Sequence, residues 1–259
     1  MHASAIAVQG AGPTSAYTEF RAAVAQAQIT HWLAGLRPRA TVLDISGPGT
    51  NAADLAAYAG HRVLRVLPGA PEGSPRGLGG RAAPRAGDSK RGQSPLWVAG
   101  DQFGLEFLAD GCADGVIAED GTLSRNLAAE SLVGEIARVL RPGGGILACV
   151  DNLTLGMAAL AQQNAWPNLA DLPHADVLLV PWPDGTITRC YGSEQLREMF
   201  TAAGFDVSWI RPRTVFAPRA VSYLLARDPS SLPRLLSAEL RARTDDSVGD
   251  HLVISARKR

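Results

Sequence analysis

Several residue types that usually direct an interpretation are scarce in this chain of 259 residues. Lys occurs only at Lys90 and Lys258, and there are three cysteines. Cys112, Cys149 and Cys190 lie far apart and form no CxxC or Cys/His pattern, so neither a disulfide framework nor a zinc site is indicated. We expect no metal site, and this cysteine usage fits a reducing compartment such as the cytoplasm.

Long apolar runs and an excess of one charge are also missing. No stretch reaches the roughly 18 apolar residues of a membrane helix, and the N-terminal sequence MHASAIAVQGAG has neither a basic start nor a long apolar run. Lys+Arg and Asp+Glu number 25 each, which gives a formal net charge of zero. A protein that binds mainly by neutralising phosphates would be basic. We therefore expect neither a membrane partner nor a nucleic-acid partner.

The residues that are present can build a full hydrophobic core. The chain is 46% hydrophobic and 19% charged, which is ordinary for a globular protein of one domain. Near the N-terminus, Phe20, Val24 and His31 recur at helical spacing and predict an amphipathic helix over residues 15–36. We expect residues 1–38 to act as a helical lid over a site in the single domain.

The next segments alternate between strand and helix patterns. Residues 41–46 are apolar and β-branched, residues 52–59 are rich in Ala and Leu, and residues 62–67 (RVLRVL) again fit a strand. Gly60 is placed to end the helix between the two strands. This βαβ unit implies a parallel sheet that is covered on both faces.

The same patterns continue to the C-terminus. Strands are predicted at residues 96–99, 115–118, 146–150, 205–210, 221–226 and 251–256, and helices at residues 124–140, 153–163, 193–203 and 232–242. A hairpin is predicted from residues 177–180 and 186–191, joined around Asp184-Gly185.

Two segments interrupt the alternation. Residues 68–94 are rich in Gly, Pro and Arg, so we expect a flexible surface insertion. An RNA contact suits this insertion less well than a solvated linker, because it holds no aromatic side chain to stack on a base. Residues 151–192 exceed the length of a simple crossover and predict an insert that caps the site or pairs two chains, as in a homodimer.

The turn after the first predicted strand carries the clearest chemical signal. Residues 42–49 read VLDISGPG, and a strand, a glycine turn and a helix in this order present free backbone N–H groups at the carboxyl edge of a parallel sheet. Many such turns only connect a strand to a helix, so the motifs that follow along the chain decide whether this turn is interpreted as a binding site. Gly100-Asp101 follows the third strand, and the run RVLRPGG (residues 138–144) precedes the fifth.

This order of signals resembles the class I S-adenosylmethionine-dependent methyltransferase family over residues 40–150, and RVLRPGG is its most specific part. The resemblance implies an α/β fold: a Rossmann-like doubly wound sheet, mostly parallel, with an antiparallel C-terminal strand at residues 251–256. It also implies S-adenosylmethionine as the cofactor.

The resemblance further implies which residues bind that cofactor. In the family, the acid that ends the first strand and the glycine loop hold the methionine part, the acid after the third strand contacts the adenine, and the residue leaving the fourth strand faces the sulfonium. In this sequence the corresponding positions are Asp44, Ser46, Gly47, Gly49, Asp101 with Gln102 beside it, and Glu119.

The chain departs from the family at two places. The glycines fall one position away from the family's loop spacing counted from Asp44, and Leu67 stands where an acid normally binds both ribose hydroxyls. A charged acceptor contributes about 1.5 to 3 kcal/mol, so its loss weakens binding about tenfold or more. The alternative to a methyltransferase is therefore a methyltransferase-like protein without transfer activity: a binding or regulatory subunit, or a cyclase that uses the cofactor as a scaffold.

Methyl transfer itself demands little of the side chains. The sulfonium activates the methyl group, so in-line displacement needs mainly a nucleophile held about 3 to 3.5 Å away and exclusion of water. We expect the acceptor to be a small organic metabolite. A general base helps when the nucleophile is a hydroxyl, and the candidates are His31, His174 and Glu119. A packed helix position suits His31 better than a catalytic role, and Glu119 with Asp120 also fits a turn cap, so none of the three is preferred.

Overall fold

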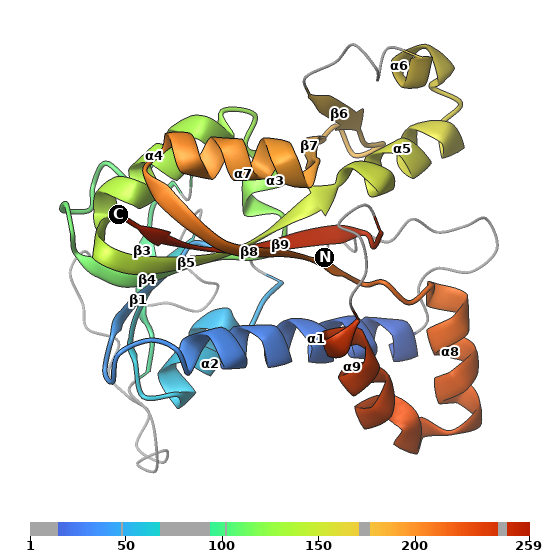
Figure 1. Ribbon diagram of the computed structural model, residues 1–259, viewed down its shortest axis with the longest axis horizontal. Coiled ribbons are helices and arrows are strands. Elements are labelled where there is room, and N and C mark those ends of the chain that lie inside the picture. Colours follow the sequence, from blue (N-terminus) through green and yellow to red (C-terminus); the bar gives the residue numbers. More distant parts are fainter. Residues whose placement is uncertain (1–14, 48, 68–93, 102, 171–176, 243–247) are drawn as a thin grey trace.

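The computed structural model describes residues 15–47, 49–67, 94–101, 103–170, 177–242 and 248–259. A nine-stranded sheet lies at the centre of the molecule, and helices cover both of its faces (Figure 1). Its parallel part consists of β3 (Leu96–Ala99), β2 (Arg62–Leu67), β1 (Thr41–Asp44), β4 (Ala113–Ala118) and β5 (Leu140–Asn152), in that spatial order. The strand order reverses between β1 and β4, which places a crevice-forming switch point at their carboxyl ends.

The other four strands extend the sheet beyond β5, either by pairing with β5 or by pairing with one of its neighbours. The C-terminal strand β9 (His251–Lys258) runs antiparallel beside β5, and β8 (Phe205–Arg213) pairs antiparallel with β9. The end of β5 also pairs in parallel with β7 (Ile187–Tyr191), which forms a hairpin with β6 (Leu178–Pro181). The predicted hairpin and the predicted antiparallel C-terminal strand are both confirmed.

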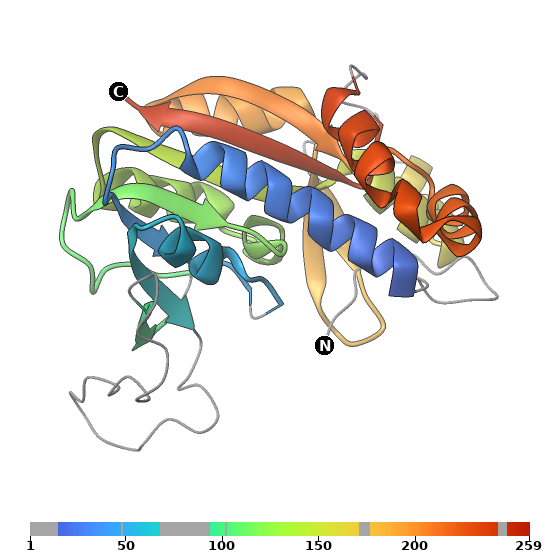
Figure 2. The same ribbon diagram turned by 90° about the horizontal axis from the view of Figure 1, so that it is seen from below.

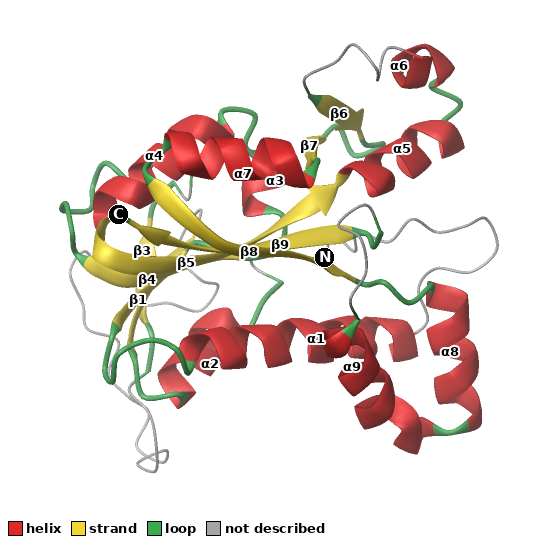
Figure 3. Ribbon diagram, in the orientation of Figure 1, coloured by secondary structure: helices red, strands yellow, loops and turns green. Residues whose placement is uncertain are grey.

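Helices form the two outer layers (Figure 3). One face carries α1 (Ser15–Leu33), α2 (Ala52–Tyr58), α8 (Pro218–Arg227) and α9 (Leu232–Arg241), with the short 3₁₀ turn η2 (Pro229–Ser231) between the last two. The other face carries α3 (Thr122–Arg125), α4 (Ala129–Val139) and α7 (Ser193–Ala202), while α5 (Leu153–Gln162) and α6 (Trp166–Ala170) lie beside the hairpin. Strand residues alternate between the two layers, so Val116 packs towards α4 and Ile117 towards α2.

Helix α1 runs along the sheet, as Figure 2 shows. Tyr17, Phe20 and Val24 pack against α8 and α9, whereas Leu33 near the C-terminal end packs under the sheet. The buried stripe therefore shifts around the helix, and His31 is exposed rather than sharing the face of Phe20 and Val24. The lid assignment stays a prediction, because residues 1–14 lie outside the described residues.

One predicted strand is wrong. Residues 221–226 belong to helix α8, in which Val221 and Leu225 are buried four residues apart and Pro218 occupies the first turn. The run of apolar residues resembled a strand, but Tyr223 and Leu224 are exposed on the outer face of the helix. Burial therefore recurs every four residues, as on one face of a helix, and not at every second residue, as in a strand.

The remaining differences from the sequence predictions concern boundaries. The helix predicted at residues 124–140 is divided into α3 and α4, because Asn126 adopts an extended conformation between them. The insertion predicted at residues 68–94 lies, except for its last residue, outside the described residues.

Candidate functional site

The loop after β1 is fastened to the end of β4. Ser46 is fully buried, and its hydroxyl accepts a hydrogen bond from the backbone N–H of Glu119 (3.0 Å). The N–H of Gly47 donates to the carbonyl oxygen of Glu119 (3.3 Å). These bonds fix the glycine turn at the switch point of the sheet, which is where the sequence placed it.

Asp44 ends β1 and supports this turn from within the protein. Its carboxylate is fully buried and accepts a hydrogen bond from the N–H of Ser46 (3.0 Å). The other carboxylate oxygen lies 3.5 Å from Nε of Arg65, and neither of these two atoms has a hydrogen-bond partner among the described residues. Arg65 instead donates to the carbonyl oxygen of Gly47 (3.2 Å) and lies over the ring of Trp97. Burial raises the pKa of Asp44, against the hydrogen bonds from Ser46 and the nearby Arg65.

The outer side of the glycine turn faces two charged side chains. A Cβ atom built on Gly47 would collide with the carboxylate of Asp120 and would lie 2.7 Å from an Nη atom of Arg125. On Gly49 it would lie 3.3 Å from the Asp120 carboxylate. Asp120 and Gly121 both have positive φ angles, of 58° and 66°, so the chain turns sharply here between β4 and α3. Pro48 lies outside the described residues.

Glu119 takes part in a buried ion pair. Arg213, from the end of β8, donates to both of its carboxylate oxygens, at 2.6 and 2.9 Å. Nε of Arg213 donates to Gln28 of α1 (2.6 Å), so the pair lies between the sheet and α1. Both charged side chains are less than a tenth exposed. The residue predicted to face the sulfonium is thus bound to a cation on the α1 side of the sheet.

A second buried group lies where β5 ends and β9 begins, and the sequence analysis did not identify it. The antiparallel register pairs Asp151 with His251, and their side chains approach to 3.8 Å. Burial raises the pKa of Asp151 to about 6, against the nearby Arg125, and burial lowers the pKa of His251 well below its ordinary value. An acid at the end of one apolar strand and a histidine at the start of another were the only sequence signals.

The predicted adenine and ribose positions lie on β2 and β3. Leu67 is the last residue of β2, as expected, so this strand ends without an acid. Asp101 is exposed just after β3, and its carboxylate accepts a hydrogen bond from the N–H of Phe103 (2.8 Å). Gln102 lies outside the described residues.

The histidine candidates are not brought to this site. His31 is exposed in the last turn of α1. Its neighbour Trp32 packs against Gly115 near the start of β4 and against Gly145 on β5, which is the amino end of the sheet. His174 lies outside the described residues. The described candidates are therefore divided between the two ends of the strands.

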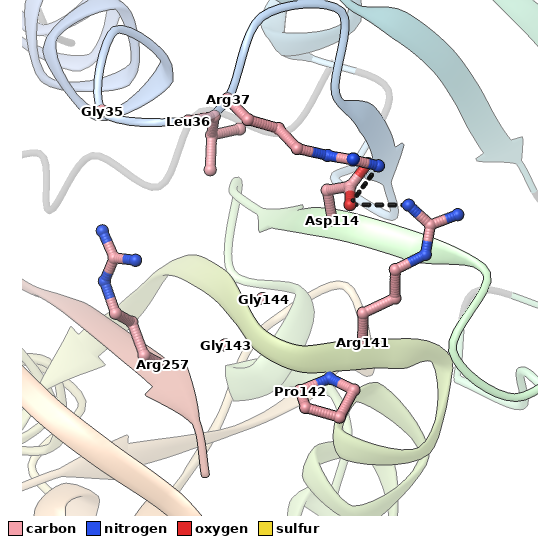
Figure 4. A pocket seen from close by; sticks show the side chains of 9 residues that line it. All are labelled: Gly35, Leu36, Arg37, Asp114, Arg141, Pro142, Gly143, Gly144 and Arg257. Atoms are coloured by element: carbon pink, nitrogen blue, oxygen red, sulfur yellow. Dashed lines mark hydrogen bonds and ion pairs between the residues drawn. The ribbon is translucent and has the colours of Figure 1, made fainter.

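A pocket of about 320 Å³ opens at the amino end of the sheet (Figure 4). Its lining includes the C-terminal end of the RVLRPGG run, and the full set is Gly35, Leu36, Arg37, Asp114, Arg141, Pro142, Gly143, Gly144 and Arg257. Arg37 and Arg141 both bind the carboxylate of Asp114, at 2.9 and 2.7 Å. Burial raises the pKa of Asp114, but hydrogen bonds from Arg37, the N–H of Thr41 and Arg141 outweigh it and hold the pKa below its ordinary value.

The RVLRPGG run therefore has a structural role in this protein. Arg138 donates to the carbonyl oxygens of Leu105 (2.8 Å) and Leu108 (2.7 Å) and pairs with Glu135. Arg138 thus fastens the segment between β3 and β4 to the end of α4, and Arg141 at the start of β5 donates to the carbonyl oxygen of Gly111 in the same segment (3.0 Å). The run identifies the fold and does not approach the glycine turn.

Among the described residues, no three His, Cys, Asp or Glu side chains gather closely enough to hold a metal ion. None of the described helices has the length and apolar character needed to cross a bilayer.

The strand order and the antiparallel β9 define the class I S-adenosylmethionine-dependent methyltransferase fold. Solved structures with this fold include the 1,6-didemethyltoxoflavin-N1-methyltransferase of Burkholderia thailandensis with bound S-adenosylhomocysteine. It is 21% identical, with a TM-score of 0.55 over 94% of this chain and 81% of that one. Methyltransferases from Mesorhizobium loti (16% identity, TM-score 0.53, 90% and 98% of the two chains) and Methanosarcina mazei (17%, 0.52, 86% and 94%) are also similar.

No family model matches the sequence, and no curated protein matches it. The similarity to known proteins is thus one of structure, at identities that establish the fold alone.

Proposed function

We propose that this protein binds S-adenosylmethionine at the carboxyl ends of β1 and β4 and transfers its methyl group to a small organic molecule. One observation carries the proposal: buried hydrogen bonds fix the turn at Gly47 and Gly49 at the switch point, and the charged side chains of Asp120 and Arg125 lie against its outer side. The Burkholderia enzyme of the same fold was solved with S-adenosylhomocysteine, which supports this choice of cofactor.

The residues fit the amino-acid end of the cofactor better than its ribose. Because Gly47 and Gly49 lack a side chain, the carboxylate of Asp120 lies directly against the turn, with Arg125 beside Gly47. At the ribose end, Leu67 offers an apolar contact in place of a charged acceptor, so we expect binding about tenfold or more weaker than with an acid there. Asp101 stays the proposed contact of the adenine.

When bound, the cofactor supplies a methyl group already activated by a sulfonium. The chain then has to bind the cofactor, orient the acceptor and exclude water. Glu119 is held by Arg213, so its part is to shape the end of β4 and not to take a proton. An acceptor that is already nucleophilic suits this arrangement, because methyl transfer to such an acceptor requires no base.

The balance of 25 basic and 25 acidic residues supports a compact acceptor, with neither a nucleic acid nor a membrane as partner. The hairpin lies at the end of the sheet order, and its outer strand β6 suits pairing between two copies of the chain. A homodimer is therefore part of the proposal.

Calorimetric titration with S-adenosylmethionine and S-adenosylhomocysteine tests cofactor binding. We expect saturable binding that Gly47→Ala weakens about tenfold or more, because the added methyl collides with Asp120 and Arg125. Gly134→Ala on α4 is the matched control, since a Cβ there meets nothing within 4 Å. If neither ligand produces heat or a thermal shift at millimolar concentration, the proposal is wrong.

A second candidate is a methyltransferase-like protein that binds the cofactor without transferring a methyl group. Two observations favour this second candidate: β2 ends at Leu67 without an acid, and the carboxylate of Glu119 is paired with Arg213. Incubation with methyl-labelled cofactor and a panel of small metabolites separates the two candidates. Labelled product supports the first, whereas tight binding without labelled product across the panel supports the second.

A further inference from the structure

The carboxylates at the carboxyl edge of the sheet differ in how freely they can reach a ligand. The side chains of Asp44, Glu119 and Asp151 are buried, and each lies beside a cationic or hydrogen-bonding partner. Asp120 follows Glu119 directly, yet its side chain is 36% exposed. Its neighbour Arg125 is 29% exposed, so this turn offers one accessible charge of each sign.

The pairing between these two side chains is loose. An Nη atom of Arg125 lies 3.8 Å from a carboxylate oxygen of Asp120, which is beyond hydrogen-bonding distance. Partly exposed pairs of this kind contribute little to stability, so separating them costs little. Both side chains also lie against the glycine turn, as the crowding of a Cβ on Gly47 shows.

The backbone below these side chains is firmly held. The hydroxyl of Thr122 donates to the carbonyl oxygens of Ile45 (3.1 Å) and Glu119 (2.9 Å), which connects the turn to both β1 and β4. The N–H of Arg125 donates to the carbonyl oxygen of Gly121 (2.9 Å). The backbone that carries the two charges is thus fixed before a ligand arrives, which reduces the entropy lost on binding.

An α-amino acid carries the same two charges, an ammonium and a carboxylate, on one carbon atom. We propose that Asp120 binds the ammonium, and Arg125 the carboxylate, of the amino-acid end of S-adenosylmethionine above Gly47 and Gly49. The inference rests on the proposed function and assigns to these two residues the contact that the sequence placed on Asp44. Each side chain exchanges a loose partner for a charge-assisted hydrogen bond, and a guanidinium can donate two such bonds to a carboxylate.

Three ligands that differ at the amino-acid end test the assignment by calorimetry. S-adenosylhomocysteine carries both charges, decarboxylated S-adenosylmethionine lacks the carboxylate, and 5′-methylthioadenosine lacks both groups. Arg125→Gln should raise the Kd of S-adenosylhomocysteine about tenfold, equal to about 1.4 kcal/mol, and leave the other two ligands within about twofold. Asp120→Asn should weaken the first two ligands and leave 5′-methylthioadenosine within about twofold.

Arg197→Gln is the matched control, because Arg197 is an exposed arginine on α7 and its loss removes the same charge away from the turn. Unchanged binding of 5′-methylthioadenosine shows that a variant has kept its fold. The assignment is overturned if Arg125→Gln and Asp120→Asn bind S-adenosylhomocysteine as the unaltered protein does, or if they weaken all three ligands equally. Failure of the unaltered protein to bind S-adenosylhomocysteine would overturn the proposed function together with the assignment.

Discussion

The two ends of the sheet use the same kinds of charged residue in different surroundings. At the carboxyl end, Glu119 and Arg213 form a bidentate pair in which both side chains are less than a tenth exposed. At the amino end, Asp114 binds Arg37 and Arg141, whose side chains are 62% and 42% exposed. Exposure of the charged groups to water, more than the number of contacts, therefore decides how much each ion pair contributes to stability.

Acid pKa values follow the same division. Burial raises the pKa of Asp44 and of Asp151 at the carboxyl end, although cations lie near both. At the amino end, burial also raises the pKa of Asp114, but hydrogen bonds from Arg37, Thr41 and Arg141 together outweigh it and hold the pKa below its ordinary value. Asp44 and Asp151 are therefore ionised at a cost to stability, whereas Asp114 is stabilising as an anion.

Breaking the pair at the carboxyl end should have the largest effect. Arg213→Met leaves the Glu119 carboxylate buried without its cation, and we expect the free energy of unfolding to fall by about 3 to 5 kcal/mol. Urea denaturation followed by circular dichroism measures it. Adding Glu119→Gln to this variant should restore part of the stability, because the uncompensated charge is gone. A loss no larger than that of Arg37→Gln would contradict the comparison.

The raised pKa of Asp151 predicts a stability that depends on pH. Between its ordinary value of 3.8 and about 6, the folded protein holds a proton on Asp151 that the unfolded chain releases, so this group lowers stability as the pH rises. Asp151→Asn removes that dependence. Relative to the unaltered protein, the variant should gain up to about 3 kcal/mol between pH 4 and pH 7.

Thermal and urea unfolding of both proteins across this pH range measure the difference. His251, whose pKa is lowered, acts with the opposite sign: its contribution is present above pH 6.5 and is lost as the pH falls. Since His251 is present in both proteins, comparing them separates the two groups. A difference in stability that is the same at pH 4 and pH 7 would show that Asp151 ionises normally.

The parallel half of the fold could be predicted because its signals are local. Residues 62–67 match β2 in full, since the run RVLRVL begins two residues after Gly60, which has a φ of 86°. The glycine turn was identified for the same reason. The error at α8 arose where an apolar run lies on the outer layer, because burial there depends on packing against α1, which the local sequence does not encode.

The contacts of the candidate site were largely beyond prediction. Glu119 and Arg213 are 94 residues apart, and they meet only because β8 pairs with β9 and β9 pairs with β5. No local sequence pattern indicates that Asp120 is exposed, because its exposure depends on two successive positive φ angles at Asp120 and Gly121. Sequence reasoning thus located the turn, and three-dimensional pairing determined which acids face it.

Packing at the amino end gives a third, smaller prediction. A Cβ on Gly115 would lie 2.9 Å from the ring of Trp32 and 3.0 Å from the side chain of Leu36, whereas on Gly145 it would lie 3.4 Å from the Trp32 ring. Gly115→Ala should therefore cost about 1 to 3 kcal/mol by overpacking. Gly145→Ala against the same ring is the matched control and should cost less, as measured by urea denaturation. Equal losses would mean that the strand positions, and not the close contacts with Trp32 and Leu36, set the cost.

The smallest effect should come from Arg37→Gln at the amino end. Arg37 is largely exposed and Asp114 keeps Arg141, so the loss at pH 7 should be no more than about 1 kcal/mol. It should shrink in 1 M salt, where exposed charges are screened. It should also shrink as the pH falls below 3.8, because the lowered pKa of Asp114 stabilises the fold only while that acid is ionised. If the loss is instead several kcal/mol and insensitive to salt, Asp114 behaves as a desolvated charge, and the two ends of the sheet are electrostatically alike.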